Sequence, residues 1–349
     1  MQKSPSKRDI CSIDRIISST VNIEREKVTN CLFSEEMSFE EKGLEIYNYQ
    51  KRYNKVYRSF LEIIGRLNIS PGAIEEIPFC PVSLFKSNTI KSGNWEAQQI
   101  FLSSGTTAME RSNHSVRDIP FYHENARHIW NQDFGALREY DFISLLPNYH
   151  DNPSSSLLSM VSHFMKNSFY GEEKYFLNDL GALHTYLEES KKSRQKTVLI
   201  GVSFALLSYL DLYSHVDMSH LIVIETGGMK RYREELTRSA LQKRLSQGFQ
   251  NATLCSEYGM TECFSQIYAI RGDQFRLNDR MRILISDPSD PFYLLPMGRT
   301  GRVNIIDLAN IDTLSFFATD DIGKISDDEH IEILGRISNS DLRGCNYLI

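Results

Sequence analysis

The sequence lacks any apolar run that approaches the roughly 18 residues needed to cross a membrane as a helix. Its N-terminal stretch, MQKSPSKRDICSIDR, also lacks the apolar core of a signal peptide. We therefore expect no membrane span and a cytoplasmic location.

An excess of basic residues is missing too. The 39 Lys and Arg residues are outnumbered by 45 Asp and Glu residues, which gives a formal net charge of -6. This balance offers no general electrostatic reason to expect nucleic acid as a partner. The six cysteines form no CxxC pair, so the sequence predicts neither a zinc site nor a disulfide framework. We expect most of them to be buried thiols.

The 349 residues, 41% of them hydrophobic, are enough for a main domain with a large core. Residues 1–76 contain no proline between Pro5 and Pro71, and their apolar residues recur every three or four positions. This spacing predicts two or three amphipathic helices, which we expect to pack on the main domain at 77–349.

Strand and helix patterns alternate along the main domain, which favours a layered α/β fold with a largely parallel sheet. From about residue 267 the strand patterns become shorter and more evenly spaced, which predicts a β-rich subdomain. The alternating stretches read QIFLSS, DIPFYHENARHIWNQDF, DFISLLP, SSSLLSMVSHFMKN, TVLIGV, FALLSYLDLY, LIVIETGG and KRYREELTRSALQKRLSQ.

The stretch FLSSGTT at 101–107 has two interpretations. One is a strand and turn leading into a helix capped by a hydroxyl residue. The other is a phosphate-binding loop built from backbone N–H groups and hydroxyls after a strand. Neither a Walker A loop nor a GxGxxG fingerprint is present, so the stretch alone does not decide between them.

Two further stretches carry the same ambiguity. In LCSEYGMTECFSQ at 254–266, Tyr258 could stack on a purine, Thr261 could contact a phosphate and Glu262 could bind Mg²⁺, or the stretch could be a tight bend. In FFATDDIGKI at 316–325, an acidic pair between two strands could form an ordinary turn or accept the hydroxyls of a ribose.

The order of these motifs is more specific than any one of them. SSGTT, YGMTE, TDDIG, Gly335-Arg336 and Arg343-Gly344 resemble the core motifs of the adenylate-forming superfamily of acyl and aryl ligases. Within it the sequence is most similar to the LuxE-type acyl-protein synthetases, which the stretches LLPNYHDNPSSSLLSM at 145–160 and ETGGMK at 225–230 resemble, and more distantly to phenylacetate-CoA ligase. The resemblance implies the layered α/β domain of these ligases with its C-terminal β-rich subdomain. Because the chain stops at Ile349, it also predicts that the mobile C-terminal domain is lacking.

The resemblance implies ATP and Mg²⁺ as cofactors and a carboxylic acid, in the nearest likeness a fatty acid, as substrate. Thr261 would contact the α-phosphate, Glu262 would bind Mg²⁺, and Arg111 would stand near the phosphates where the superfamily usually has a lysine. The remaining nucleotide-binding residues would be Ser103, Ser104, Gly105, Thr106, Thr107, Gly227, Gly228, Tyr258, Gly259, Asp321 and Arg336.

A cysteine near the C-terminus accepts the acyl group in LuxE-type proteins and passes it to a reductase. Cys345 in RGCNYLI matches that position, and Arg343 beside it would favour the thiolate. We also expect His114 and His150 to contact the substrate, although a lone histidine is commonly structural. Cys255 and Cys263, by contrast, are expected in the core.

Three functions remain open at this point. The chain could be an ATP-dependent acyl-protein synthetase that acylates Cys345. It could instead pass the acyl group to a carrier protein, coenzyme A or an alcohol in surface-polysaccharide or metabolite biosynthesis. The third alternative is a degenerate nucleotide-binding subunit that scaffolds a reductase complex.

Overall fold

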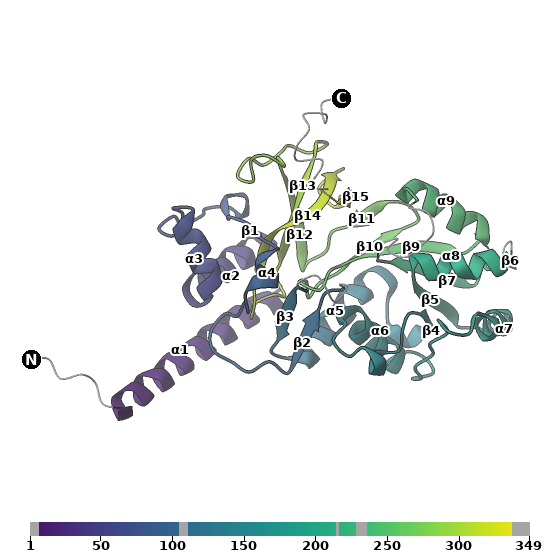
Figure 1. The fold of residues 1–349 in the computed structure, drawn as a ribbon, viewed down its shortest axis with the longest axis horizontal. Coiled ribbons are helices and arrows are strands. Elements are labelled where there is room, and N and C mark those ends of the chain that lie inside the picture. Colours follow the sequence, from purple (N-terminus) through teal and green to yellow (C-terminus); the bar gives the residue numbers. More distant parts are fainter. Residues whose placement is uncertain (1–6, 105–110, 214–215, 228–235, 337–349) are drawn as a thin grey trace, which may run out of the picture.

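A computed structural model describes residues 7–104, 111–213, 216–227 and 236–336 of the chain (Figure 1). Within these residues the largest sheet has eleven strands, and ten of them follow the order β12-β13-β14-β15-β11-β10-β9-β7-β5-β4. The remaining strand, β1 (Cys80–Pro81), pairs with β14. This mixed α/β architecture agrees with the fold class predicted from the sequence.

The parallel part of the sheet consists of β4 (Tyr140–Leu145), β5 (Lys196–Val202), β7 (Leu221–Thr226) and β9 (Thr253–Tyr258). Every residue of β4 and β7 is buried. A strand that is covered on both faces needs apolar residues at successive positions rather than at every second one. The stretches FISLL and LIVIE have such nearly continuous apolar sequences for this reason. The carboxyl ends of these strands form one edge, where α/β sheets commonly bind ligands.

The strands after residue 267 pair antiparallel with one another. The strand patterns there predicted a β-rich region but not the direction of pairing. One prediction within it is wrong. Asp320 and Asp321 do not lie in a turn between two strands, because residues 316–325 form a single strand, β14. The antiparallel strands are β10 (Ile267–Ile270), β11 (Gln274–Arg276), β12 (Met281–Ser286), β13 (Thr300–Asp307), β14 (Phe316–Ile325) and β15 (His330–Arg336).

Helices cover both faces of the parallel strands. α5 (Ile119–Phe134) and α6 (Ser156–Lys166) pack on the face that contains Ile224 and Cys255. The opposite face packs against α7 (Leu180–Ser190), α8 (Ser203–Leu212) and α9 (Arg238–Gly248). The side chain of Ser155 accepts a hydrogen bond from the backbone N–H of Leu158, which makes Ser155 the N-cap of α6.

The N-terminal helices α1 (Lys7–Phe33), α2 (Phe39–Tyr53) and α3 (Lys55–Ile63) confirm the predicted helical pattern. They share a buried apolar cluster with β12, β13 and β14. Gln50 of α2 fixes this contact, because its amide donates to the backbone oxygen of Asn310 at 2.8 Å and its oxygen accepts from the backbone N–H of Ser315 at 3.0 Å. The helical segment therefore lies against the antiparallel part of the sheet (Figure 1).

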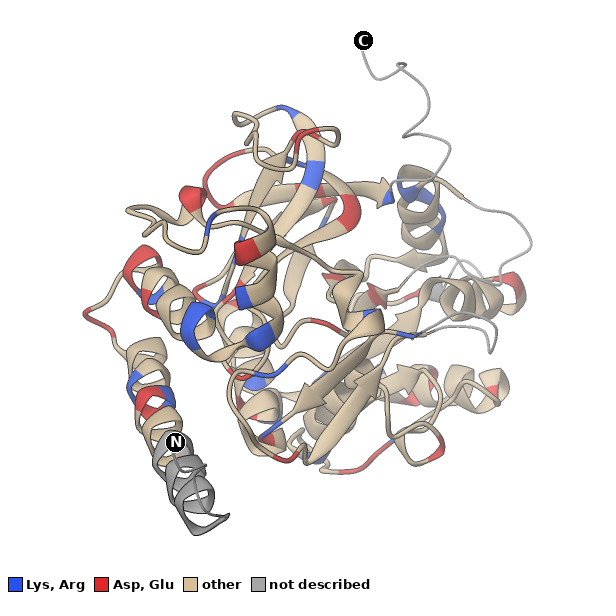
Figure 2. Ribbon diagram, turned by 60° about the vertical axis from the view of Figure 1, so that its left-hand side comes forward, with Lys and Arg blue, Asp and Glu red and all other residues tan. Residues whose placement is uncertain are grey.

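Charged residues of both signs are spread over the helices and loops (Figure 2). Among the described residues, no helix is long and apolar enough to cross a membrane. The short elements are η1 (Ile74–Glu76), α4 (Leu84–Ser87), β2 (Gln99–Leu102), β3 (Asn113–Val116), η2 (Leu137–Glu139), η3 (Tyr149–Asp151), β6 (Val216–Asp217) and β8 (Phe249–Gln250).

Candidate active site

The serine-rich stretch lies at the end of a β-hairpin. β2 and β3 pair antiparallel, so a strand follows the loop, and the interpretation of a turn that leads directly into a capped helix is wrong. The backbone N–H of Ser103 donates to the carbonyl of Ser112 at 3.0 Å, and the N–H of Ser112 returns a 2.9 Å bond to the Ser103 hydroxyl. These two bonds close the base of the loop. Gly105, Thr106 and Thr107 lie outside the described residues.

Glu262 is buried next to this base. Its pKa is raised, because burial disfavours the carboxylate more than a hydrogen bond from the Ser112 side chain favours it. Among the described residues, no three His, Cys, Asp or Glu side chains gather as a metal site. One carboxylate fits Mg²⁺ bound together with substrate phosphates, which is how this ion commonly binds in proteins.

His114 of β3 holds the backbone just before Glu262. Its Nδ1–H donates to the carbonyl of Thr261 at 2.7 Å, and its Nε2 accepts from the hydroxyl of Thr313 at 2.8 Å. This assignment follows from the carbonyl, which can only accept. Burial lowers the pKa of His114 to about 4, so the ring is neutral at pH 7. The ring is completely buried, and its two nitrogens hold protein groups.

Two residues that sequence reasoning missed also bind the backbone of this loop. Together with His114 they form a clamp on the residues around Thr261 and Glu262. The amide of Asn310 donates to the carbonyl of Glu262 at 2.8 Å. The carboxylate of Asp307 accepts from the backbone N–H groups of Phe264 and Ser265 at 2.7 and 3.0 Å. The loop that carries Thr261 and Glu262 is thus held from three directions. No local motif marks Asp307 or Asn310, because both act on residues more than 40 positions away.

The structure brings three of the predicted nucleotide-binding residues together. The hydroxyl of Tyr258 donates to Asp321 Oδ2 at 2.7 Å, and Arg336 Nε donates to Asp321 Oδ1 at 3.1 Å. Asp321 and Arg336 are directly opposite each other on β14 and β15. Burial and the Asp321 charge raise the pKa of Tyr258 well above its usual value, so the phenol keeps its proton.

Gly227 lies at the carboxyl end of β7, with φ of 77°, a conformation that suits glycine. Its carbonyl lies 3.2 Å from the hydroxyl of Ser203, which also donates to the buried carboxylate of Glu225. Gly228 lies outside the described residues. Gly259 follows Tyr258 at an exposed position.

The remaining predicted residues are spread more widely. Ser104 and Arg111 are exposed on either side of the residues 105–110. His150 is exposed in η3, where its Nε2 lies 3.8 Å from a carboxylate oxygen of Glu173. Cys345 lies outside the described residues, so its role stays a prediction. Cys255 and Cys263 are buried, as expected.

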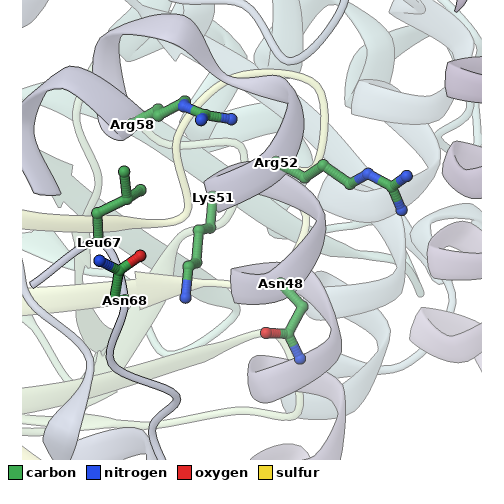
Figure 3. Close-up of a pocket in the computed structure, with 6 residues that line it drawn as sticks. All are labelled: Asn48, Lys51, Arg52, Arg58, Leu67 and Asn68. Carbon is green, nitrogen blue, oxygen red and sulfur yellow. The ribbon is translucent and has the colours of Figure 1, made fainter. Parts of the chain in front are cut away.

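A basic groove of about 420 Å³ lies between α2 and α3, on the N-terminal helices. Figure 3 shows Lys51 and Arg52 extending from one helix and Arg58 from the next. The lining also includes Asn48, Leu67 and Asn68. None of the predicted site residues lines this groove, so it is separate from the site around Glu262 and Asp321.

No protein-family model matches the sequence, and no curated protein matches it. Solved structures do match the fold. A 2-hydroxyisobutyryl-CoA ligase in complex with 2-HIB-AMP aligns with a TM-score of 0.62 and 12% identity, over 85% of this chain and 68% of the ligase. ATP-bound MatB from Rhodopseudomonas palustris aligns with a TM-score of 0.51 and 18% identity, over 68% of this chain and 47% of MatB.

The O-succinylbenzoate coenzyme A synthetase of Bacillus subtilis, in complex with AMP, gives a TM-score of 0.50 and 14% identity over 69% of this chain. The alignment covers 49% of that synthetase, so the chain spans about half the length of the synthetase and of MatB. These likenesses establish the fold: the chain has the mixed α/β fold of adenylate-forming ligases.

Proposed function

We propose that the chain uses ATP to activate a carboxylic acid as its acyl-adenylate. The observation that carries this proposal is the convergence of Tyr258, Asp321 and Arg336 from three different strands. Arg336 is also close enough to Glu262 to favour its charged form. The carboxylate of Asp321, the ring of Tyr258 and the carboxylate of Glu262 would thus form one nucleotide site, on a fold that suits the reaction.

In the proposed step, a carboxylate oxygen of the acid attacks the α-phosphorus of ATP. The bond from this phosphorus to the oxygen bridging to the β-phosphate breaks, and pyrophosphate leaves with the electron pair. Because two anions must approach each other, the site has to orient them and neutralise charge. Mg²⁺ held by Glu262 would supply neutralisation at the phosphates. Asp321 would fix the ribose, and Thr261 would donate its hydroxyl to the α-phosphate.

We further propose that the acyl group moves from the adenylate to the thiol of Cys345. The thiolate sulfur attacks the acyl carbon, a thioester forms, and AMP leaves with its oxygen. The sequence resemblance supports this acceptor, a fatty acid as substrate, and an acyl reductase or carrier protein as the next partner. The hairpin at Ser103 and Ser104, with Arg111 beyond it, would hold the phosphates.

Labelled carboxylic acids test the acceptor directly. After incubation with ATP and Mg²⁺, we expect acid-stable, hydroxylamine-sensitive label on the chain, because a thioester has these properties. Cys345→Ser should abolish the label, whereas Cys31→Ser, a matched change in α1, should keep it. Label that persists in Cys345→Ser would refute this acceptor while leaving adenylate formation intact.

A further inference from the structure

A carboxylate outside the predicted motifs lies at the edge of the proposed site. Glu257 is the next-to-last residue of β9, directly before Tyr258. Its Oε2 accepts a hydrogen bond from the hydroxyl of Thr226, the residue opposite it on β7. Both side chains lie at the carboxyl ends of parallel strands, where this class of sheet commonly binds ligands.

The second oxygen of Glu257 lies against the loop that carries Thr261. A Cβ atom added to Gly259 would be only 2.6 Å from Glu257 Oε1, far inside contact distance. Gly259 therefore leaves the space that this carboxylate occupies. The orientation of Glu257 thus depends on the lack of a side chain at residue 259, which lies two residues before Thr261.

The strand pairing also shows on which face of the sheet Glu257 lies. Thr226 and Glu257 are paired residues, so they extend the face formed by Ile224 and Cys255, which packs under α5 and α6. Glu225 lies on the opposite face, where it is near Arg238. Tyr258, which reaches Asp321, alternates with Glu257 along β9. Glu257 therefore faces away from the proposed ribose contact.

Among the residues that the structure describes, no cation contributes to the pKa of Glu257, which burial raises to about 7. The negative charge of Glu225 adds to this effect, and the Thr226 hydroxyl opposes it. A plain hydrocarbon chain placed here would desolvate Glu257 without offering a hydrogen bond, which is costly. A ligand with a hydrogen-bond donor would avoid that cost.

We infer that Glu257 is a specificity-determining residue for the acid, and that the acid carries a hydroxyl or ammonium group that binds this carboxylate. This inference rests on the proposed function and refines it. The substrate would be a hydroxy- or amino-substituted acid, and an unsubstituted fatty acid would be a poor substrate. Hydroxyl and ammonium share the required chemistry, and the test below separates them.

The test uses carboxylate-dependent exchange of pyrophosphate into ATP. Matched sets of acids, each with an unsubstituted, a hydroxylated and an aminated member of equal chain length, are compared by kcat/KM. We expect the hydroxylated or the aminated member to exceed the unsubstituted one by roughly tenfold to a hundredfold, the range for a hydrogen bond to a charged group. A preference for unsubstituted members would overturn the inference.

Glu257→Gln removes the charge and keeps a polar side chain of the same shape. The ratio of aminated to unsubstituted acid should fall to near one if ammonium is the donor, whereas a hydroxyl donor should keep part of its preference. Glu75→Gln, at an exposed position in η1, should leave both ratios unchanged. An unchanged ratio in a folded Glu257→Gln protein would assign Glu257 a purely structural role and overturn the inference.

A second variant guards against misfolding of the first. Thr226→Val removes the hydroxyl that binds Glu257 and keeps the carboxylate, so the preference for a donor should persist or increase. Its loss in Thr226→Val would contradict the inference. Should unsubstituted acids alone drive exchange, the inference fails and acid activation stands. Should no acid drive exchange, activation itself fails, so the two failures are distinguishable.

Discussion

At the scale of single residues, the proposed nucleotide site would depend most on Asp321. It is buried, and it accepts from both Tyr258 and Arg336. Its neighbour Asp320 is exposed on the same strand. Two adjacent aspartates in opposite environments provide a variant and its control.

We expect Asp321→Asn to weaken ATP binding by roughly tenfold to a hundredfold, because hydrogen bonds from the ribose to a charged acceptor would be lost. Calorimetric titration with ATP and Mg²⁺ measures this. Asp320→Asn should bind ATP as the unchanged protein does. Equal affinities for the two variants would place the ribose elsewhere.

His114 gives a pH prediction at the same scale. Its pKa is lowered to about 4 in the folded chain, against about 6.5 when unfolded, because burial disfavours the charged ring. The unfolded chain therefore binds the extra proton first as pH falls. The stability from the neutral ring is present above about pH 6.5 and is lost as pH approaches 4, by on the order of 3 kcal/mol.

Urea unfolding at pH 7 and pH 4 measures this loss. His114→Gln should be less stable at pH 7, and its free energy of unfolding should change less between the two pH values. His150→Gln, which alters an exposed ring, should keep the full pH dependence. A His114→Gln protein with an unchanged pH dependence would show that another group causes it.

At the scale of elements, the loop after β9 is fixed by side chains from three other segments. His114, Asn310 and Asp307 bind its backbone from β3, from the 308–315 loop and from β13. Asp307 is fully buried and accepts from two N–H groups of the loop, from the Ser265 hydroxyl and from the N–H of Ala309.

Asp307→Asn should destabilise the protein by about 2–4 kcal/mol, because the amide replaces an acceptor that faces hydrogen-bond donors. It should also weaken ATP binding, since the loop holds Thr261 and Glu262. The midpoint of urea unfolding and ATP titration measure the two effects. Asp328→Asn, in an exposed turn, serves as the control. Full stability of Asp307→Asn would refute the clamp.

The elements themselves were predictable where the local pattern was long or strongly apolar, as in β5, β7, α5 and α6. Strand β3 of the hairpin was not anticipated because it has only four residues, and the serine-rich turn before it resembles a helix cap. α7 (Leu180–Ser190) was not anticipated. The acidic pair was placed between two strands because aspartate favours turns, whereas residues 316–325 form one strand, in which Asp321 accepts hydrogen bonds from Tyr258 and Arg336.

The candidate site, like the fold, was only partly predictable from the sequence. The order of motifs along the chain predicted Tyr258, Asp321 and Arg336 through family resemblance, and the fold gathers them. The order of motifs could not predict the clamp on the loop after β9, because His114, Asp307 and Asn310 bind residues that are distant in the sequence. Glu257 also escaped notice, since its position depends on Thr226 and on the space at Gly259.

At the scale of the whole molecule, buried charges join helix α1 to the 308–315 loop of the sheet. Arg25 of α1 donates two 2.7 Å hydrogen bonds to Asp312, and Arg117 donates a third at 3.3 Å. The contact links α1, the segment between β3 and α5, and the 308–315 loop. The helices at 1–76 are therefore expected to unfold together with residues 77–349.

Asp312→Ala should lower the free energy of unfolding by about 3 kcal/mol, because it leaves two largely buried arginines without their partner. Urea unfolding should still show a single transition, by both circular dichroism and tryptophan fluorescence. Glu24→Ala, which breaks an exposed pair with Lys27, should change stability by less than about 1 kcal/mol. Two separate transitions would contradict the shared core of helices and sheet.

The most direct measurement of the central claim is exchange of labelled pyrophosphate into ATP, with a panel of carboxylic acids that includes hydroxylated and aminated members. We expect exchange that requires both an acid and Mg²⁺ and that falls at least tenfold in Glu262→Gln, since this change removes the proposed charged metal ligand. Absence of acid-dependent exchange across the whole panel, by a folded protein that binds ATP, would contradict acid activation.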